Sequence, residues 1–293
     1  MNILVGLIYS LRPWQWIKNF FILLPLVFGE KIFSFPANFR TGIAFLLFCL
    51  VSGSMYLIND IVDAERDRVH PKKKNRPIAS GKIGKKQAIV AAVVLLGVSL
   101  TGAFCLNMVF GLICITYIVF NILYSKVLKH AVIIDVFCIS FFFILRIMAG
   151  SVVADVTLSH WMIAMTALLA LFLGFNKRRQ ELHLLEEGAI AHRQVLDKYN
   201  VYFIDQMLSV TTSSIVVAYM LYTVDARTVQ EFGTTNLLYT VPFVYYGIFR
   251  YLYLIHEREE DGDPTNILLS DRKMLVNLII WVLVCCVIIY GSR

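Results

Sequence analysis

Apolar residues in this chain come in long runs that polar segments interrupt at intervals. Six runs contain no Asp, Glu, Lys or Arg, and a helix needs about 20 such residues to cross a hydrocarbon core about 30 Å thick. The runs are Thr41–Asn59, Gln87–Ser125, Val156–Asn176, Gln206–Val224, Phe232–Phe249 and Met274–Ser292. Because Gln87–Ser125 has about twice the required length, we interpret it as two helices that a tight turn at Leu106-Asn107 joins.

Two further apolar stretches carry isolated charges. Trp14–Glu30 contains Lys18, and Val132–Ala154 contains Asp135 and Arg146. The pattern therefore predicts an all-α integral membrane protein with nine transmembrane helices in a single bundle. The predicted helices cover residues 14–31, 40–60, 87–105, 108–125, 132–154, 160–177, 206–224, 236–255 and 273–291. We expect one transmembrane domain over residues 1–293, in which cytoplasmic loops 61–86 and 177–205 form a cap over the active site.

The composition agrees with a membrane location. Of the 293 residues, 58% are apolar and only 16% are charged, whereas a soluble domain needs roughly 25% charged residues. Its six cysteines all fall inside predicted helices, and none has ligand spacing with a histidine. A zinc or iron–sulfur site is therefore not expected.

Basic residues are concentrated in alternate connections. Nine Lys and Arg residues lie in Ile61–Lys86 and five in Lys177–Asp205. The connections at the opposite ends of the predicted helices carry few Lys or Arg residues. The positive-inside rule then places the N-terminus in the cytoplasm and the C-terminus outside. Topology and contact with anionic membrane lipids could by themselves explain most of the net charge of +7. Basic loops between helices do not indicate a nucleic-acid partner.

The most informative polar segment follows the second predicted helix. Asn59, Asp63 and Asp67 are spaced four apart, and Asp60 precedes Asp63 by three, so a helix would place these side chains on one face. Clustered carboxylates repel one another without a cation, and hard oxygen ligands suit Mg²⁺ bound to substrate phosphates. The alternative is a solvated helix end with ordinary Asp/Arg pairs.

A basic stretch, His70-Pro71-Lys72-Lys73-Lys74-Asn75-Arg76-Pro77-Ile78-Ala79-Ser80-Gly81, comes shortly after the carboxylates. A metal ion beside Lys and Arg side chains neutralises the charge that develops on a pyrophosphate leaving group. The sequence therefore predicts a metal-dependent diphosphate site with Asp63 and Asp67 as catalytic carboxylates and Asp60 in support. The predicted metal ligands are Asn59, Asp63 and Asp67.

The spacing Asn59-Asp60-x-x-Asp63-x-x-x-Asp67, followed by Arg76-Pro77-x-x-Ser80-Gly81, resembles the first aspartate-rich motif of UbiA-type membrane prenyltransferases. The resemblance implies a UbiA-like bundle of nine helices with both termini placed as above. It also implies an enzyme that binds a prenyl diphosphate through Mg²⁺ and transfers the prenyl group to an acceptor.

One departure from that family changes the expected substrate. A second motif, D-x-x-x-D, is typical after the sixth helix, but this chain reads Gly174-Phe175-Asn176-Lys177-Arg178-Arg179-Gln180-Glu181-Leu182 there. Three cations and one carboxylate in place of an aspartate pair favour a donor with a second, separate phosphate.

This pattern is similar to the decaprenyl-phosphate phosphoribosyltransferase branch of the superfamily. Four other blocks carry the same resemblance: Leu11-Arg12-Pro13-Trp14-Gln15-Trp16-Ile17-Lys18-Asn19, Tyr124-Ser125-Lys126-x-Leu128-Lys129-His130, Leu145-Arg146-x-x-Ala149-Gly150 and Lys177-Arg178-x-x-Glu181-Leu182. The resemblance implies transfer of 5-phosphoribose from phosphoribosyl diphosphate to a polyprenyl phosphate in the bacterial cell membrane. The active site would face the cytoplasm, and the product would feed the synthesis of arabinose donors for the cell envelope.

The same resemblance implies roles for several residues. Cationic side chains would hold the donor's 5-phosphate and the acceptor phosphate, Tyr124 would contact substrate, and Glu181 would bind a sugar hydroxyl or a second metal. The cations are Lys18, Arg76, Lys129, Arg146, Lys177 and Arg178.

Charges within a membrane span are functional candidates by default. Asp135 and Arg146 are 11 residues apart, which on a helix is about 16 Å, so they cannot pair directly. We favour a site role for Arg146 and leave Asp135 open, and the alternative is that both stabilise the bundle near the interface.

Two other functions compete with phosphoribosyl transfer. A prenyltransferase with an aromatic acceptor fits the first aspartate motif, but the missing second motif counts against it. A transporter predicts charges near the membrane midplane and some repeat symmetry, and the acids here cluster at a loop edge instead. The sequence leaves the oligomeric state open, with a homo-oligomer among the options.

Overall fold

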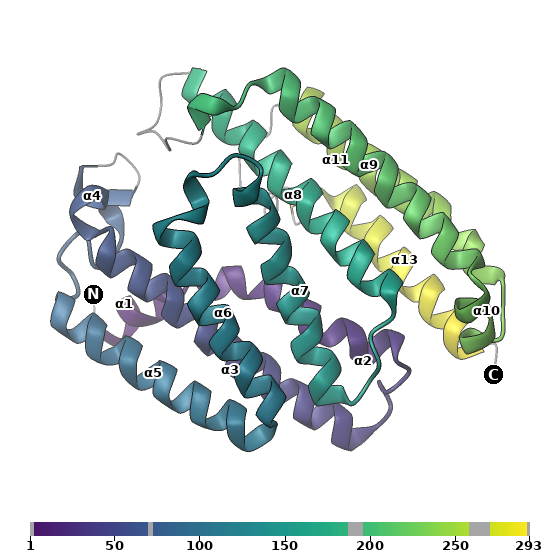
Figure 1. Ribbon diagram of the computed structural model, residues 1–293, viewed down its shortest axis with the longest axis horizontal. Helices are drawn as coiled ribbons and strands as arrows, with labels where there is room; N and C mark the ends of the chain where they lie inside the picture. Colours follow the sequence, from purple (N-terminus) through teal and green to yellow (C-terminus); the bar gives the residue numbers. More distant parts are fainter. Residues whose placement is uncertain (1–2, 70–72, 187–195, 258–269, 292–293) are drawn as a thin grey trace. The chain divides into compact units, whose positions relative to one another are not determined.

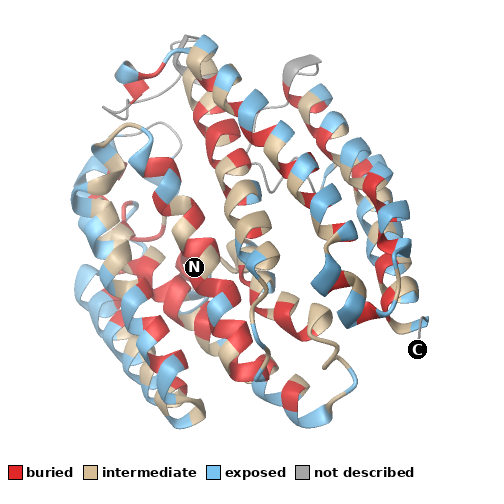
Figure 2. Cartoon of the chain, turned by 45° about the vertical axis from the view of Figure 1, so that its right-hand side comes forward, coloured by how far each residue is buried: buried red, intermediate tan, exposed pale blue. Residues whose placement is uncertain are grey.

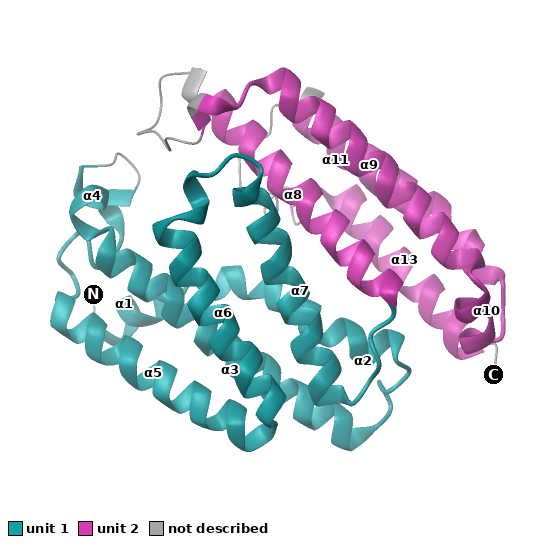
Figure 3. Cartoon of the chain, viewed as in Figure 1, with its two compact units in different colours: residues 1–159, 190–192 teal, residues 160–189, 193–293 magenta. Residues whose placement is uncertain are grey.

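In the computed structural model, residues 3–69, 73–186, 196–257 and 270–291 are described (Figure 1). All regular secondary structure in these ranges is helical, as the sequence predicts. The chain divides into two compact units, one of residues 1–159 and 190–192 and the other of residues 160–189 and 193–293 (Figure 3). Each unit is described by itself below.

The first unit contains the segments that carry the aspartates. Its helices are α1 (Ile3–Ser10), η1 (Pro13–Leu23), α2 (Leu24–Phe28), α3 (Phe35–Val62), α4 (Ala64–Arg68), η2 (Lys73–Asn75), α5 (Lys85–Leu106), α6 (Met108–Lys126), η3 (Leu128–His130) and α7 (Ile134–Ala154). Helix α3 packs against α5, η1, α7 and α6, and more than half of its most apolar window is buried, as is that of α7. Buried residues accordingly concentrate on these central helices, while α5 and α6 present more of their surface to the outside (Figure 2).

Aromatic and aliphatic side chains from η1, α3, α5, α6 and α7 fill the core of this unit. Phe48 and Met55 of α3, Tyr117 of α6 and Leu145 of α7 belong to one buried cluster. The Phe48 and Tyr117 rings meet edge to face, with centroids 4.9 Å apart, an arrangement that adds to the energy of area burial. Long apolar residues on the outer faces of α5 and α6 are exposed, as a lipid environment requires.

The turn between α5 and α6 forms where the sequence predicts it. Helix α5 ends at Leu106 and α6 begins at Met108. Between them, the Asn107 side-chain oxygen accepts hydrogen bonds from the backbone N–H groups of Val109 and Phe110, at 2.8 and 3.1 Å. This N-cap satisfies two donors that an uncapped helix start would leave unpaired.

The first predicted span, residues 14–31, is not one continuous α-helix. The chain instead forms the 3₁₀ helix η1 and the short α-helix α2. Pro25 stands in the first turn of α2 and has no backbone N–H to donate to the preceding turn. The conformation therefore changes at Leu24.

The second unit contains α8 (His160–Glu186), η4 (Leu196–Lys198), α9 (Val201–Val224), α10 (Ala226–Phe232), η5 (Asn236–Thr240), α11 (Val241–Glu257) and α13 (Arg272–Gly291). Helices α8 and α9 pack together, as do α11 and α13. Helix α8 continues nine residues beyond its predicted end at Lys177, so the predicted cytoplasmic loop 177–205 begins inside a helix. The prediction of a single domain stays a prediction.

Among the described residues, seven helices are long and apolar enough to cross a membrane: α3, α5, α6, α7, α8, α9 and α13. The other two predicted spans correspond to η1 with α2 and to η5 with α11, where α11 has 17 residues. The helical membrane class is thus confirmed, whereas nine spans and the sides of the two termini are not.

Candidate active site

The aspartate cluster lies where α3 meets α4. The Asp63 N–H donates to the Asn59 carbonyl at 2.9 Å, and the Asp67 N–H donates to the Asp63 carbonyl at 2.8 Å. The helical hydrogen-bond spacing therefore continues across the junction, and Asn59, Asp63 and Asp67 stand on successive turns, as their spacing predicts. Asp60 and Asp67 are each only 3% exposed.

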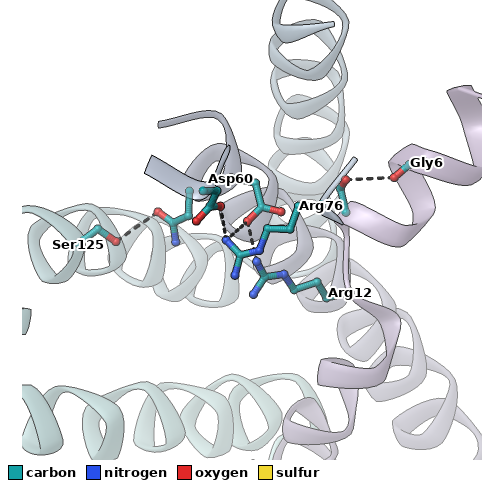
Figure 4. A network of polar contacts seen from close by, with 8 residues as sticks. Gly6, Arg12, Asp60, Arg76 and Ser125 are labelled. Atoms are coloured by element: carbon teal, nitrogen blue, oxygen red, sulfur yellow. Dashed lines mark hydrogen bonds and ion pairs between the residues drawn. The ribbon is translucent and has the colours of Figure 1, made fainter. Parts of the chain in front are cut away.

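Two arginines from distant parts of the sequence neutralise these buried carboxylates. Arg12 Nη2 donates to Asp60 Oδ1 at 2.6 Å. Arg76 Nη1 donates to Asp60 Oδ1 at 3.1 Å and to Asp67 Oδ2 at 2.6 Å. Figure 4 shows the two guanidinium groups converging on Asp60. We call Arg12, Asp60, Arg76 and Asp67 the arginine–aspartate clamp.

The segment that carries Arg76 is held in place by apolar anchors. Ile78 and Ile83 are almost fully buried and pack in one cluster with Leu57 of α3 and Ala88 of α5. Between the two isoleucines, Gly81 adopts a φ of +75°, which glycine reaches at no steric cost. The Arg76-Pro77-x-x-Ser80-Gly81 pattern thus forms a turn that fixes Arg76 beside the aspartates.

An exposed ion cluster lies just outside this site. Lys85 Nζ donates to Glu65 Oε1 at 3.0 Å and Arg68 Nη1 donates to Glu65 Oε2 at 2.8 Å. The hydrogen bond from Lys85, together with the charges of Arg68 and Lys85, lowers the pKa of Glu65. These contacts link the start of α5 to α4, but screening by solvent and salt makes exposed pairs weak.

The end of α6 contacts the same region. Ser125 Oγ donates to the Asn59 side-chain oxygen at 3.3 Å, as Figure 4 also shows. Tyr124 is half-buried, with its ring edge-on to that of Phe142 of α7, and Lys129 follows on η3. The Tyr124-Ser125-Lys126 block therefore reaches the first aspartate motif through Asn59.

Arg146 lies in the interior of the first unit and is 4% exposed. Its Nε donates to Asn19 Oδ1 at 2.8 Å, its Nη1 to the Phe142 carbonyl at 2.7 Å and its Nη2 to Tyr117 Oη at 3.4 Å. The guanidinium carbon also lies 5.3–5.5 Å from the ring centroids of Phe48, Tyr117 and Phe143. No carboxylate of the described residues pairs with Arg146, so aromatic faces and neutral acceptors stabilise the charge.

The Arg146 block also fixes the N-terminal segment. Asn19 of η1 accepts from Arg146 and donates to Cys49 Sγ and Ser52 Oγ of α3, both at 3.1 Å. A Cβ atom at Gly150 would come within 1.9 Å of the Ile22 carbonyl oxygen of η1. The Leu145-Arg146-x-x-Ala149-Gly150 block is therefore the surface on which η1, with Lys18, docks.

The predicted cations of the second unit lie on α8. Arg178 is buried and its Nη1 pairs with Glu181 Oε2 one turn along the helix, while Arg179 Nε donates to Asp205 Oδ1 of α9 at 2.8 Å. Lys177 is half-buried. The carboxylate of Glu181 therefore pairs with Arg178. The sequence predicted that Glu181 binds a sugar hydroxyl or a second metal, and it did not predict this ion pair.

Arg12, Asn19 and Tyr117 take part in these networks, although the sequence predicted no role for them. Arg12 and Asn19 belong to the quoted N-terminal block, but Arg12 bonds Asp60 across 48 residues and Asn19 bonds Arg146 across 127. Nothing in local spacing reveals such contacts. Tyr117 gave no signal, since it is one of 14 tyrosines in an apolar chain.

The donor set at the aspartate motif fits a hard divalent cation. Asn59, Asp63 and Asp67 supply only oxygen atoms on successive turns, and the buried Asp60 and Asp67 carboxylates already attract the cationic Arg76. In the described part of the chain, no group of three or more His, Cys, Asp and Glu residues is arranged to hold a metal ion. The predicted metal site has two carboxylates, those of Asp63 and Asp67, and its third ligand is the amide oxygen of Asn59.

Comparison with known proteins identifies the family. The model of the UbiA prenyltransferase family matches residues 3–279. This chain belongs to the UbiA prenyltransferase family. It is therefore an integral membrane transferase, which agrees with its apolar helices.

Curated UbiA relatives align along almost the whole chain. A decaprenyl-phosphate phosphoribosyltransferase of Mycolicibacterium smegmatis is 32% identical over 96% of this chain and 91% of the relative. One of Corynebacterium glutamicum is also 32% identical, over 99% of this chain and 88% of the relative. A third, from Mycobacterium tuberculosis, is 29% identical over 96% and 93%.

Solved UbiA structures share the fold. A homologue from Archaeoglobus fulgidus bound to GPP and Mg²⁺ superposes with a TM-score of 0.70 at 18% identity, covering 98% of this chain and 99% of that one. The apo structure of a homologue from Aeropyrum pernix has a TM-score of 0.58 at 11% identity. At these identities the likeness supports the UbiA fold and no more.

Proposed function

We propose that this protein transfers 5-phosphoribose from phosphoribosyl diphosphate to a polyprenyl phosphate and releases pyrophosphate. The observation that carries the proposal is the match of nearly the full chain to relatives named decaprenyl-phosphate phosphoribosyltransferase. The charges on α8 support it, since the sequence resemblance implies that Lys177, Arg178 and Arg179 of this helix stand where typical family members have aspartates. Cations there suit a donor with an additional phosphate.

Asn59, Asp63 and Asp67 would hold Mg²⁺, with Asp60 held behind them in the clamp. The bound metal would neutralise the negative charge of the departing diphosphate. Arg12 already neutralises Asp60, so Arg76 can give up its contact with Asp67 and donate to a diphosphate oxygen instead. The clamp thus provides one metal ligand, Asp67, and one displaceable cation, Arg76.

The reaction exchanges one bond at the ribose C1. The C1–O bond to diphosphate breaks, its electron pair leaves with pyrophosphate, and an oxygen of the lipid phosphate forms the new bond to C1. That oxygen is already anionic, so no strong general base is required. Lys18, Lys129, Lys177 and Arg178 would hold the donor 5-phosphate and the acceptor phosphate, with Tyr124 and Glu181 contacting the sugar or lipid head.

Among the predicted cations, Arg146 has the least direct access to substrate. Three of its donors contact Asn19, Phe142 and Tyr117, and aromatic rings surround its guanidinium group. We assign it the task of fixing η1, which carries Lys18, with electrostatic attraction to anionic substrates as its second effect. Lys18 then provides the direct contact.

The membrane arrangement proposed here has nine crossings. The η1–α2 and η5–α11 segments would cross in addition to the seven apolar helices, placing the N-terminus in the cytoplasm and the C-terminus outside. The basic residues of segments 61–86 and 177–205 support this orientation. The active site would then face the cytoplasm of a bacterial cell, where phosphoribosyl diphosphate is available, and the product would serve as a precursor of arabinose donors for the cell envelope.

The test uses purified protein in detergent with Mg²⁺, polyprenyl phosphate and phosphoribosyl diphosphate labelled in the ribose. Label that moves into the organic phase, and that EDTA abolishes, would support the proposal. A parallel assay supplies a prenyl diphosphate and an aromatic acceptor instead. Turnover of these substrates without phosphoribosyl transfer would be consistent with the UbiA fold and would overturn the assignment of phosphoribosyl diphosphate as the donor.

A further inference from the structure

A groove runs between two helices of the second unit, and none of its lining residues has a proposed role in transfer. Asp205, Leu208, Ser209, Thr212 and Ser213 of α9 line one side, and Leu252 and Tyr253 of α11 line the other. We call this the α9–α11 groove. Four of its seven lining side chains carry hydroxyl groups and one carries a carboxylate, although it lies between helices of a membrane protein.

The serines of the groove are arranged to accept hydrogen bonds. Ser209 Oγ donates its proton to the Asp205 carbonyl and Ser213 Oγ donates to the Ser209 carbonyl, both at 2.9 Å. Each hydroxyl proton is therefore committed to the helix, and the oxygen lone pairs are left to accept. The Asp205 carboxylate accepts from Arg179 Nε at 2.8 Å, and a carboxylate has about four acceptor positions.

Thr212 differs from its neighbours on the same helix. Thr211 and Ser214, like the two groove serines, donate to a carbonyl of the preceding turn. Thr212 is 9% exposed, and no group in the described part of the chain hydrogen-bonds its hydroxyl. A buried hydroxyl without a partner is costly. Thr212 also lines the groove, so a ligand bound there would give this hydroxyl a partner.

Helical spacing extends the groove face with apolar and aromatic residues. Val217 and Met220 follow Ser213 by four and seven residues on α9, Phe249 and Tyr246 precede Tyr253 by four and seven on α11, and all four are exposed, which suits acyl chains. At the polar end, Arg250 lies over the Tyr253 ring and pairs with Asp271. Along the groove, the order of groups is a carboxylate, hydroxyls, an aromatic ring and then apolar side chains. This order suits an amphiphile that has its polar head at the membrane interface.

We propose that the α9–α11 groove binds a membrane lipid whose headgroup carries an ammonium with N–H donors, as in phosphatidylethanolamine. The Asp205 carboxylate and the Ser209 and Ser213 oxygens accept from the ammonium, and the Thr212 hydroxyl donates to the headgroup phosphate. A headgroup with phosphate as its only polar group is disfavoured, because Asp205 repels it. This site does not depend on the phosphoribosyl reaction, and its test needs no turnover.

The test compares lipids that differ only in the headgroup. Phosphatidylethanolamine and phosphatidylcholine have the same net charge and phosphate, but choline has no N–H donor, and phosphatidylglycerol adds a net negative charge. Delipidated full-length protein is titrated with each lipid, with matched acyl chains, and bound lipid is counted by native mass spectrometry. We expect phosphatidylethanolamine to bind about tenfold more tightly than the other two, which is the range of a charge-assisted hydrogen bond.

Three variants locate the site. Thr212→Val keeps the side-chain shape and removes the unpartnered hydroxyl, so it should weaken phosphatidylethanolamine binding about threefold to tenfold without loss of stability. Asp205→Asn should abolish the preference over phosphatidylcholine. Ser214→Ala, which removes a hydroxyl of the same helix outside the groove, should change neither.

Two results would overturn the proposal: equal binding of the ethanolamine and choline lipids, or a preference that Thr212→Val and Asp205→Asn both leave intact. Since Asp205 also pairs with Arg179, its variant could fail to fold. In that case, the lipid comparison on the parent protein and the result for Thr212→Val decide whether the proposal holds. Transferase activity of the parent is measured separately, so a failure here does not affect the proposed reaction.

Discussion

The end of α3 and the second half of α8 both carry clusters of charged side chains, and the two clusters are neutralised in different ways. At α3, Asp60 and Asp67 are buried, and their cations come from Arg12 on an N-terminal segment and Arg76 on a turn. At α8, the buried Arg178 pairs with Glu181 one turn away on the same helix. The first cluster therefore depends on tertiary packing, and the second is largely built by one helix.

This difference has consequences for stability and for function. The α3 carboxylates keep their geometry only while η1 and the turn at Gly81 are docked, so substitutions in either segment should disturb the site. A buried charge that loses its partner costs several kcal/mol. The α8 ion pairs should be less sensitive to changes elsewhere, since Arg178 pairs with Glu181 of α8 and Arg179 pairs with Asp205 of α9. We expect the largest effects at α3 and smaller effects at α8.

The largest effect is expected from Asp63→Ala. Asp63 is one of the proposed metal ligands, and among the described residues no ion pair includes it, so the substitution leaves the arginine–aspartate clamp intact. Label transfer to polyprenyl phosphate should fall about 10³-fold or more, the scale of a lost electrostatic contribution to catalysis. The melting temperature should stay close to that of the parent.

Glu65→Ala is the matched control, because Glu65 is an exposed carboxylate of the neighbouring helix α4 that pairs with Lys85. It should retain near-parental turnover. Substantial turnover by the Asp63 variant at saturating Mg²⁺ would remove Asp63 from the metal site.

Arg76→Met tests whether the clamp supports the fold. Arg76 bridges two carboxylates that are almost fully buried, and removing it leaves Asp67 without its cation. Unfolding in detergent should become easier by about 3 kcal/mol, with activity lost as well. Glu181→Gln keeps a side-chain oxygen that can accept from Arg178 and changes a partly exposed position, so it should cost less, about 1 kcal/mol. Equal losses in the two variants would contradict the contrast between the two regions.

Lys177→Ala probes the α8 cations directly. If Lys177 contacts a donor phosphate, the KM for phosphoribosyl diphosphate should rise about tenfold through loss of a charge-assisted hydrogen bond, with little change in stability. Lys198→Ala, an exposed lysine on η4 of the same unit, should leave the KM unchanged. An unaltered KM and kcat in the Lys177 variant would count against a phosphate site on α8.

Local patterns in the sequence predicted those features that local interactions determine. The turn at Asn107 and the one-face arrangement of Asn59, Asp63 and Asp67 follow from capping and helical spacing, and both are present. The end of α8 was placed too early because the apolar run stops at Asn176, although Lys, Arg, Gln and Glu are good helix formers. Loss of hydropathy marks the end of an apolar span and does not mark the end of a helix.

Contacts between distant segments could not be obtained in this way. The partners of Asp60 and Asp67 include Arg12, which is 48 residues before Asp60. Arg146 was identified as important because a charge in a span is costly, but its partner Asn19 is 127 residues away. The resemblance to the family included the blocks that contain Asn19 and Arg146, but it did not show that the two blocks are in contact.

The smallest effect expected concerns the link between these two blocks. If Arg146 acts by fixing η1, then Asn19→Ala and Arg146→Met remove the same interaction, and the double variant should be less destabilised than the sum of the single variants. The coupling energy should be about 1 kcal/mol, measured by a double-mutant cycle of thermal unfolding. Because Lys18 is the proposed phosphate contact, both single variants should raise the KM for the same substrate to a similar extent, through misplacement of Lys18.

A direct phosphate contact from Arg146 would give a different result. The Arg146 variant alone would then raise the KM for one of the two substrates, while Asn19→Ala would not, and the two sites would be additive in stability. Ser99→Ala provides the control for loss of a buried polar group in the first unit, since the Ser99 hydroxyl donates only to the Leu95 carbonyl of its own helix. That variant should show no coupling with Arg146.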